Sequence, residues 1–535
     1  MTRTRYTATR IQAGRVHLTE APGVDAKELK NYGGRWLPSA RCWTIPARWQ
    51  DIELLRHEGI SIDIPQVLLD ALTEYVPLDD FLQKAESLRA APDHPAWERL
   101  MPHQRVGVAY LTSRERALLA FTPGLGKTAT AIVAADVKQY RRILVVAPLT
   151  LRKTWEHEIQ LWATDASLSD KPGDARWTIV NPEKVTARRS KDSENAAVLK
   201  APYDGLSWDL VIMDESILYK SRTAKRTRAM ARLGAGHSDN VWLLSGSPVA
   251  AYADDLFSQM QILRPDVFTS YWRFAGQWCQ LEQTPWATKV VGNRAAERLT
   301  GYLRDIMISR TPEDVKLLPE AVFETVYVGL SDAQVESLRQ LRENGIAVVN
   351  GQPEVCDNVL AQLTRAAQIV SCPRQLDSAA EIGPKLETLR DMLEWAPLPA
   401  IVWTQFKATA QAAAELLRQK GQRVGVLQGD TPKSERGALV DAFQSGELDV
   451  LIIQLQTGKF GLSLTAAKSA IFVDRSYSSD DWIQAIARVR RLSSTESVPN
   501  YVLHAGSIDI LVDQILSKKL HSIQDLQLSD LAKYL

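Results

Sequence analysis

The sequence predicts an α/β protein with two lobes in tandem, each built on a parallel sheet with helical insertions, and a small α+β module at the N-terminus. Two series of continuous apolar runs, typical of strands buried on both faces, alternate with helical stretches. Only the first series contains a glycine-rich turn between a strand and a helix. With 535 residues, the chain is too long for one core and should form about three to four domains.

Shifts in composition suggest where the domains end. The expected parts are an accessory module (1–75), a polar linker (76–95), a first lobe with a helical protrusion (96–315), a helical segment (316–398), a second lobe (399–520) and a tail (521–535).

The overall composition narrows the choice of partners and compartment. Lysine plus arginine is 64 and aspartate plus glutamate is 63, so the net charge is close to zero. Binding of a polyanion would therefore depend on local basic patches. The four cysteines, Cys42, Cys279, Cys356 and Cys372, lack a paired-ligand spacing, which argues against a disulfide framework and a zinc cluster. The sequence contains neither a membrane-length apolar run nor the apolar core of a secretory signal. We expect a soluble cytoplasmic protein without a membrane partner.

The glycine-rich turn predicts a phosphate-binding loop. Two glycines let the backbone wrap a polyphosphate, and the first amides of the following helix point at it. The lysine would add a charge at the terminal phosphates, and the threonine hydroxyl would hold a magnesium ion. The usual pattern has a further glycine where this chain has Phe121, so a purely structural turn is the alternative. The expected binding residues are Pro123, Gly124, Leu125, Gly126, Lys127 and Thr128.

Two further features of the first series fit a nucleotide site. The apolar run 209–213 delivers Asp214 and Glu215 at its carboxyl end, where α/β sheets place their chemistry. Asp214 could hold the magnesium ion and Glu215 could deprotonate an attacking water. Gln104, in a helix start before the loop, could read the edge of adenine. The alternatives are an exposed acidic turn and a solvated glutamine.

The second series has no phosphate loop but carries a distinctive helix. Gln484, Arg488 and Arg491 are spaced i, i+4 and i+7, so they share one helix face. Arginines on one face are often merely solvated. Because this lobe has no nucleotide loop of its own, the two arginines are candidate arginine fingers for the first lobe's nucleotide.

The N-terminal module interleaves basic and aromatic residues. Arg35, Trp36 and Trp43 suit a surface that neutralises phosphates and stacks on bases, although the tryptophans could equally form the module's core. The stretch 33–46 also resembles the HARP-like module that accompanies annealing helicases.

Several ordered motifs together resemble the Swi/Snf-type branch of superfamily-two helicases. They are Gly124-Leu-Gly-Lys-Thr, Asp214-Glu, Leu244-Ser-Gly-Ser-Pro, Gln456-Thr-Gly-Lys-Phe-Gly-Leu and Gln484-Ala-Ile-Ala-Arg-Val-Arg-Arg. The segments 255–268, 308–315 and 363–373 also resemble stretches typical of this branch. The resemblance implies two RecA-like lobes, ATP and Mg²⁺ as cofactors, double-stranded or branched DNA as partner, and a monomer similar to the minimal motors of bacteria and their viruses. It implies DNA contacts at Pro148, Thr150, Ser245, Gly246, Ser247, Gln405, Thr457, Gly458 and Lys459.

The chain departs from the family pattern in several places. Ser216-Ile217 stands where alanine and histidine are common, which puts the usual link from that histidine to the Ser245 turn in doubt. Trp403 occupies a common phenylalanine position, and Leu-Ser-Ser follows Arg491 where Ile-Gly-Gln is usual. None of these changes removes a residue expected to touch phosphate, metal or water, so we expect an active ATPase.

The resemblance implies an ATP-driven double-stranded DNA translocase that remodels forks, branches or DNA-bound proteins. No segment is recognisable as a strand-separating wedge, which favours tracking on duplex. The alternatives are a strand-separating DNA or RNA helicase, and a nucleic-acid clamp that ATP switches without useful turnover.

Overall fold

The computed structural model divides the chain into two compact units. Unit 1 consists mainly of 1–121 and 126–309, and unit 2 mainly of 122–125 and 310–524. The structure describes residues 5–12, 15–20, 29, 34–38, 41–46, 52, 55, 60–65, 93–171, 175–186, 206–303, 306–315, 321–349, 352–356, 358–458, 464–489 and 497–526. The expected contacts Lys459 and Arg491 lie outside the described residues.

The N-terminal module is a mainly antiparallel sheet with the strand order β3-β4-β2-β1-β5. Tyr6, Val16, Leu18 and Ile45 are buried in its core, as strand alternation requires. Its strands are β1 (Arg5–Gln12), β2 (Arg15–Glu20), β3 (Arg35–Leu37), β4 (Cys42–Pro46) and β5 (Ser61–Asp63).

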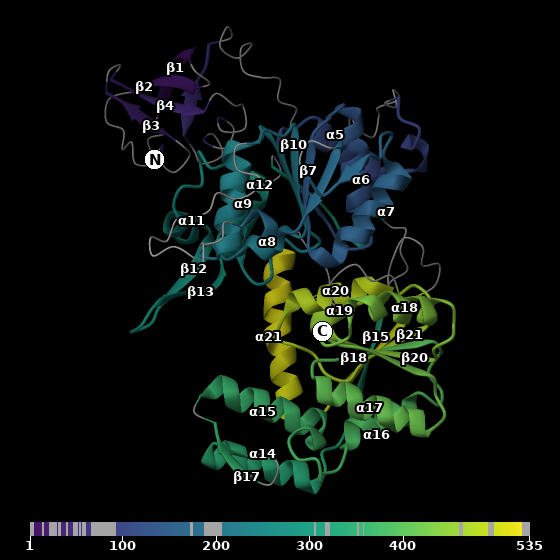
Figure 1. Ribbon diagram of the computed structural model, residues 1–535. Coiled ribbons are helices and arrows are strands. Elements are labelled where there is room, and N and C mark those ends of the chain that lie inside the picture. The colour runs from purple at the N-terminus through teal and green to yellow at the C-terminus, as the bar shows by residue number, and fades with distance from the viewer. Residues whose placement is uncertain are drawn as a thin grey trace, which may run out of the picture. The chain divides into compact units, whose positions relative to one another are not determined.

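The main sheet of unit 1 has the order β14-β6-β11-β10-β7-β9-β8, and its central strands are parallel (Figure 1). The predicted apolar runs form these strands and are buried, which confirms an α/β lobe. Parallel pairing brings the carboxyl ends of β6, β7, β10 and β11 to one edge of the sheet. The strands are β6 (Arg116–Phe121), β7 (Ile143–Val146), β8 (Leu168–Ser169), β9 (Trp177–Val180), β10 (Leu210–Met213), β11 (Asn240–Leu244) and β14 (Met307–Arg310).

Helices and one hairpin complete unit 1. The helical elements are η1 (Trp97–Arg99), α5 (Pro102–Thr112), α6 (Lys127–Val137), η2 (Leu149–Leu151), α7 (Arg152–Trp162), α8 (Pro182–Val185), η3 (Ser216–Tyr219), α9 (Lys225–Gly236), η4 (Ala253–Leu256), α10 (Phe257–Leu263), α11 (Tyr271–Trp278) and α12 (Ala296–Leu303). The hairpin pairs β12 (Cys279–Gln283) with β13 (Thr288–Asn293) in antiparallel fashion.

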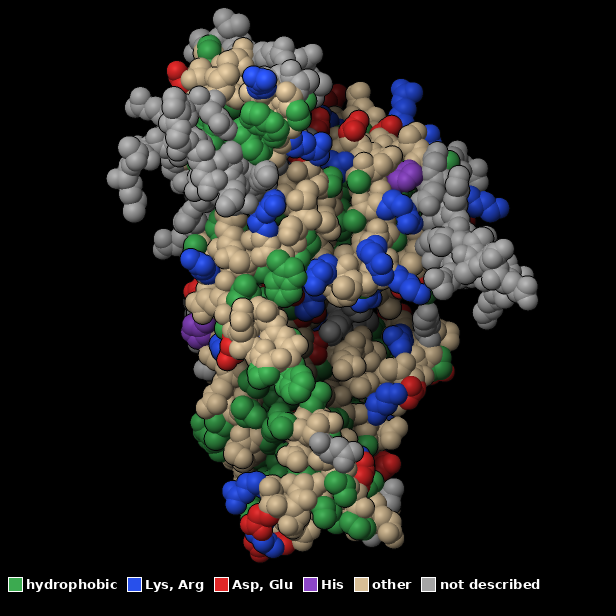
Figure 2. All heavy atoms as spheres, turned by 90° about the vertical axis from the view of Figure 1, so that its left-hand side faces the viewer, with side chains coloured by type: hydrophobic (Ala, Val, Ile, Leu, Met, Phe, Trp, Pro, Cys, Tyr) green, Lys and Arg blue, Asp and Glu red, His purple; other side chains and the backbone are tan. Residues whose placement is uncertain are grey.

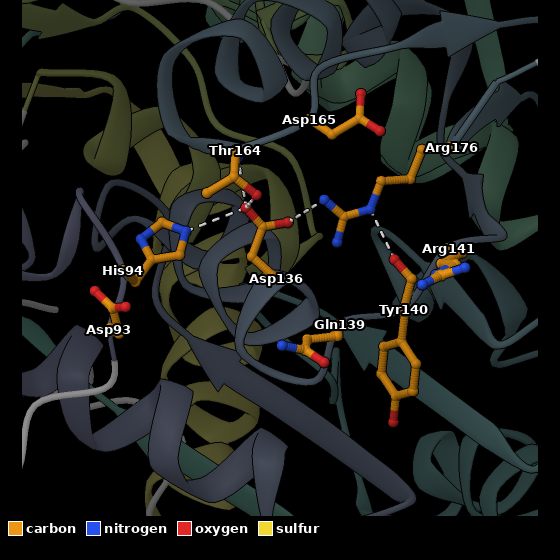
Figure 3. Close-up of a pocket in the computed structure, with 9 residues that line it drawn as sticks. All are labelled: Asp93, His94, Asp136, Gln139, Tyr140, Arg141, Thr164, Asp165 and Arg176. Carbon is orange, nitrogen blue, oxygen red and sulfur yellow. Dashed lines mark hydrogen bonds and ion pairs between the residues drawn. The ribbon is translucent and has the colours of Figure 1, made fainter.

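A buried ionic network lies at the C-terminal end of α6. Asp136 Oδ2 lies 3.1 Å from His94 Nε2 and accepts hydrogen bonds from the amide and hydroxyl of Thr164 at 2.6 and 2.8 Å. Asp136 Oδ1 lies 2.7 Å from Arg176 Nη1, and these side chains line a pocket of about 510 Å³ (Figure 3). Because these charged groups pair with one another, the network links His94, which precedes α5, to the end of α6 and to Arg176 beside β9.

The sheet of unit 2 has the order β15-β22-β21-β18-β20-β19, with every pair parallel. Its strands are β15 (Val322–Tyr327), β18 (Ala400–Thr404), β19 (Val424–Leu427), β20 (Val450–Gln454), β21 (Ser469–Phe472) and β22 (Pro499–His504). A separate hairpin joins β16 (Ile346–Val349) and β17 (Gln352–Val355). The helical elements are α13 (Pro312–Val315), α14 (Asp332–Asn344), α15 (Val359–Ser371), η5 (Pro373–Gln375), α16 (Pro384–Met392), α17 (Lys407–Gln419), α18 (Lys433–Gln444), α19 (Leu455–Gly458), α20 (Ser479–Val489) and α21 (Gly506–Asp525).

A buried lysine ties three parts of unit 2 together. Lys385 of α16 donates to the carbonyl of Val473 at 2.9 Å and pairs with Asp509 of α21 at 2.8 Å. Its burial is tolerated because each partner is an oxygen acceptor.

All four cysteines lie in the described part of the chain. The four cysteines are free and buried, as expected for reduced thiols. Among the helices that the structure describes, none combines the length and the apolar character needed to cross a bilayer.

Candidate nucleotide site and nucleic-acid contacts

The loop between β6 and α6 has the backbone that a phosphate cradle requires. Gly124 and Gly126 have φ values of 93° and 77°, a region that favours glycine. A Cβ on Gly126 would lie 1.9 Å from Gln104 Nε2, so only glycine fits there. Helix α6 begins at Lys127, whose Nζ donates to the carbonyl of Phe121 at 2.9 Å. The cradle and its cation are therefore preformed.

The structure explains the departure at Phe121. The Phe121 side chain is buried, and its ring lies where a Cβ on Gly107 of α5 would approach it to 2.9 Å. Phe121 thus stands at the position of the missing loop glycine. Its ring packs against Gly107 of α5, where the absence of a side chain leaves room for it.

Gln104 lies against the phosphate loop but is already engaged. Its Oε1 accepts a hydrogen bond from the amide of Met101 at 2.8 Å, as part of a capping box at the start of α5. The side chain is buried and lies beside Gly126. This contact fits a structural role at the loop, and recognition of adenine by Gln104 stays a prediction.

The acidic pair follows β10 at the same edge of the sheet. Asp214 Oδ2 accepts from Trp155 Nε1 of α7 at 2.8 Å, and Oδ1 accepts from the amide of Glu215 at 2.8 Å. Burial raises the pKa of Asp214, while the Trp155 bond, the Lys127 charge and the Glu215 amide oppose that rise. Glu215 is buried with φ 48°, a left-handed conformation rare for a residue with a side chain. Such strain is typical of active sites.

The oxygen donors of Thr128 and Asp214 fit a magnesium ion. Magnesium in phosphate sites takes one or two protein oxygens together with substrate phosphates. The described part of the chain contains no group of three or more His, Cys, Asp and Glu side chains that could hold a metal ion. Asp214 and Lys127 carry opposite charges at the loop, as such a site requires.

A hydrogen-bond relay connects the acidic motif with the Ser245 turn. Ser216 Oγ donates to Gln259 Oε1 at 2.6 Å, and Gln259 Nε2 donates to the carbonyl of Pro248 at 2.7 Å. Gln259 is fully buried on α10. The link that the family's histidine usually supplies therefore exists here by another route. Neither Gln259 nor Trp155 was among the site residues that the sequence predicted.

The expected DNA contacts of unit 1 differ in exposure. Thr150 is exposed and Pro148 is partly exposed, following β7. The turn residues Ser245, Gly246 and Ser247, which follow β11, are buried, and the amide of Ser245 donates to the carbonyl of Leu119 at 3.1 Å. The turn is thus bonded to the end of the neighbouring strand β6 and is less accessible than the segment after β7.

In the N-terminal module the two tryptophans separate into different roles. Trp43 is 5% exposed and belongs to the core, whereas Trp36 is 45% exposed and Arg35 is also exposed. The two rings are tilted with centroids 5.7 Å apart. The burial of Trp43 supports the core alternative for that residue, because a buried ring cannot stack on a base.

Unit 2 places Gln484 and Arg488 on one face of α20, as the spacing predicts. Arg488 Nη2 donates to Gln484 Oε1 at 2.6 Å, and both side chains are buried. Thr457 and Gly458 lie in α19, and the amide of Gln405 donates to Asp474 Oδ2 at 2.7 Å. The Trp403 ring fits because residue 458 is glycine, since a Cβ at that position would lie 2.5 Å from the ring.

The comparisons with known proteins identify the family. The family model of the SNF2-related domain matches residues 103–375, more than half of the chain, and that of the helicase conserved C-terminal domain matches residues 384–493. The chain is 27% identical over 459 residues to SWI/SNF-related matrix-associated actin-dependent regulator of chromatin subfamily A-like protein 1 of Xenopus tropicalis, covering 82% of this chain and 46% of that protein.

A second relative and a solved structure are similar as well. The chain is 26% identical over 477 residues to DNA annealing helicase and endonuclease ZRANB3 of Bos taurus, covering 85% of this chain and 42% of that protein. It therefore spans less than half the length of these two relatives. The Sulfolobus solfataricus SWI2/SNF2 ATPase core in complex with dsDNA is 23% identical, with a TM-score of 0.36, over 81% of this chain and 94% of that one. The chain belongs to the SNF2-related family.

Proposed function

We propose that the protein is an ATP-driven translocase on double-stranded DNA that remodels forks, branches or DNA-bound proteins. The main support is the arrangement at one sheet edge of unit 1, where the preformed loop and Lys127 accompany two buried carboxylates, Asp214 and the strained Glu215. Membership of the SNF2-related family and the similarity to a protein named as an annealing helicase support the choice of DNA.

The residues divide the chemistry among themselves. The loop amides and Lys127 bind and orient the phosphates of ATP, and Thr128 and Asp214 would hold the magnesium ion that neutralises phosphate charge. Glu215 takes a proton from the attacking water. The Ser216–Gln259 relay connects this site to the Ser245 turn, so the state of the nucleotide can bias the segment expected to meet DNA.

The second unit is proposed to supply the arginine finger. Arg488 is held by Gln484 on one helix face, and an arginine finger raises turnover by about 10³- to 10⁵-fold. Turnover would then depend on closure of unit 2, and alternating closure and opening would drive stepping along DNA.

One assay tests this proposal. ATP hydrolysis is measured with duplex DNA, forked DNA, single-stranded DNA and RNA, for the wild type, Lys127→Ala and Glu215→Gln. We expect duplex or forked DNA to stimulate the wild type most, and Lys127→Ala to lower turnover by about 10²- to 10³-fold because it removes a charge aimed at the phosphates. Lys138→Ala, an exposed lysine just after α6, is the matched control and should behave as wild type.

The same assay separates the alternatives. Stronger stimulation by RNA would favour an RNA helicase. ATP binding without turnover would favour a switched clamp, and phosphate release that survives both substitutions would overturn the catalytic assignment.

A further inference from the structure

The β12–β13 hairpin of unit 1 ends in a rigid turn that presents one aromatic side chain. Its strands pair from Cys279↔Asn293 to Gln283↔Thr288, and it projects from the body of the unit in Figure 1. Across the tip, the Thr284 amide and hydroxyl donate to the carbonyl of Ala287 at 2.9 and 2.7 Å, and the Ala287 amide donates back to Thr284 Oγ1 at 3.1 Å. A proline at the first central position pre-sets the turn.

Trp286 at this tip is 94% exposed, the highest value among the large hydrophobic side chains that the structure describes. An indole buries more apolar area than almost any other side chain, so a fixed turn that holds it in water points to a ligand. The neighbouring strand residues Gln280, Glu282 and Gln283 are exposed and polar. Leu281 of the same strand is 38% exposed, so Trp286 is the one aromatic side chain at a tip whose other exposed residues are mostly polar.

The base of the hairpin is anchored, so the tip has a defined place on the unit. The amide of Arg294 donates to the carbonyl of Trp278 at 2.8 Å, and the amide of Ala253 donates to Asn293 Oδ1 at 2.9 Å. Trp278 and Cys279 are buried. The hairpin is thus continuous with the packed helices α11 and η4.

A basic segment lies against the start of α11, the helix that leads into the hairpin, and its first residue, Lys220, pairs with Asp255 at 3.7 Å. Every charged residue from Lys220 to Arg232 is basic. These residues are exposed: Lys220, Arg222, Lys225, Arg226, Arg228 and Arg232. The guanidinium of Arg222 lies 4.5 Å from the ring centre of Tyr271 and 6.0 Å from that of Trp272, which brings the basic segment against α11. Figure 2 faces the side from which the hairpin projects, and there blue Lys and Arg side chains border green hydrophobic ones.

We infer that the hairpin is a DNA-junction contact, in which Trp286 stacks on the base exposed where duplex meets single strand and the Lys220–Arg232 surface holds nearby phosphates. The basic residues of this segment can bind DNA phosphates. The exposed indole on a rigid turn can stack on a base that has lost its stacking neighbour. This rests on the proposed DNA-dependent function and adds the feature of DNA that the motor recognises. The sequence alone offered no such element.

The test compares Trp286→Ala, Trp286→Phe and the wild type as full chains. Fluorescence anisotropy gives the affinities for a fork and for a blunt duplex of equal length, and 2-aminopurine at the junction reports stacking. We expect Trp286→Ala to weaken fork binding by roughly 5- to 150-fold, the range of one base–aromatic stack. It should also abolish the 2-aminopurine quenching and leave duplex affinity and duplex-stimulated ATP hydrolysis unchanged. Trp286→Phe should restore most of the fork preference.

The control is Trp395→Ala, which removes a tryptophan of unit 2 that is also more than half exposed and should leave both affinities as they are. Unchanged fork binding by Trp286→Ala, or equal loss on fork and duplex, would overturn the inference. Failure of the proposed function would look different, because the wild type itself would then show no DNA-stimulated hydrolysis on either substrate.

Discussion

The two units treat the same structural junction in opposite ways. In unit 1, β6 leads to α6 through a loop with two left-handed glycines. In unit 2, β18 leads to α17 through Gln405 and Phe406, and the carboxylate of Asp474 accepts hydrogen bonds from the Thr404 hydroxyl and the Gln405 amide, each at 2.7 Å. The loop of unit 1 thus has the left-handed glycines of a phosphate cradle, whereas the corresponding segment of unit 2 has none and its Gln405 backbone amide is bound by a carboxylate.

The segment before α17 therefore lacks the glycines that would let its backbone wrap a phosphate. For this reason we place the predicted nucleotide site at the loop of unit 1. Unit 2 must therefore contribute to ATP hydrolysis from another element, and α20 with its buried Gln484–Arg488 pair is the candidate.

Arg488→Ala should lower ATP turnover by about 10³-fold or more, because an arginine finger stabilises charge that develops only in the transition state. ATP affinity, measured with a fluorescent analogue, should change little. Arg342→Ala, at an exposed arginine of the same unit, should leave turnover unchanged. Parallel losses of affinity and turnover would instead identify Arg488 as a structural residue.

Asp136→Asn should lower the free energy of unfolding by about 3–5 kcal/mol, because it leaves the Arg176 guanidinium buried without its full counter-charge. Urea unfolding followed by far-UV circular dichroism measures this loss. Asp239→Asn, at an exposed aspartate, should stay within experimental error of the wild type. A loss below about 1 kcal/mol, the value of an ordinary exposed pair, would mean that the network does not hold α6 in place.

Gln259→Leu should uncouple the acidic motif from the Ser245 turn. The substitution leaves the Ser216 hydroxyl and the Pro248 carbonyl without this partner, a loss of about 1–3 kcal/mol in stability. The ratio of DNA-stimulated to basal ATP hydrolysis should fall more than basal hydrolysis does. Gln261→Leu removes a glutamine on the same helix that bonds only to the carbonyl of Phe268 in the described contacts. An equal ratio in both variants would exclude a relay.

The sequence predicted the elements made of local patterns. The continuous apolar runs at 209–213 and 400–404 became central strands, and the helical spacing of Gln484 and Arg488 placed them on one face. Both inferences depend only on the period of the backbone, which neighbouring residues determine.

The unpredicted features depend on partners distant in the sequence. Trp155 meets Asp214, and Asp474 meets Gln405, through contacts that only the folded sheet creates. The β12–β13 hairpin was missed because β12 is mostly exposed, β13 is mostly half-buried and both are mixed in polarity, so they lack a clear alternating pattern. A buried tryptophan and an exposed one also look alike in a sequence, as Trp43 and Trp36 show.

The close approach of Trp403 to Gly458 predicts how related sequences should vary. A methyl group at Gly458 would collide with the indole at 2.5 Å, so the two positions cannot change independently. Homologues with phenylalanine at the Trp403 position should tolerate alanine at the Gly458 position, whereas those with tryptophan should retain glycine. An alignment of the family would then show paired substitution at these two positions. In this chain, replacement of Trp403 by phenylalanine would have to come before any substitution of Gly458 in α19.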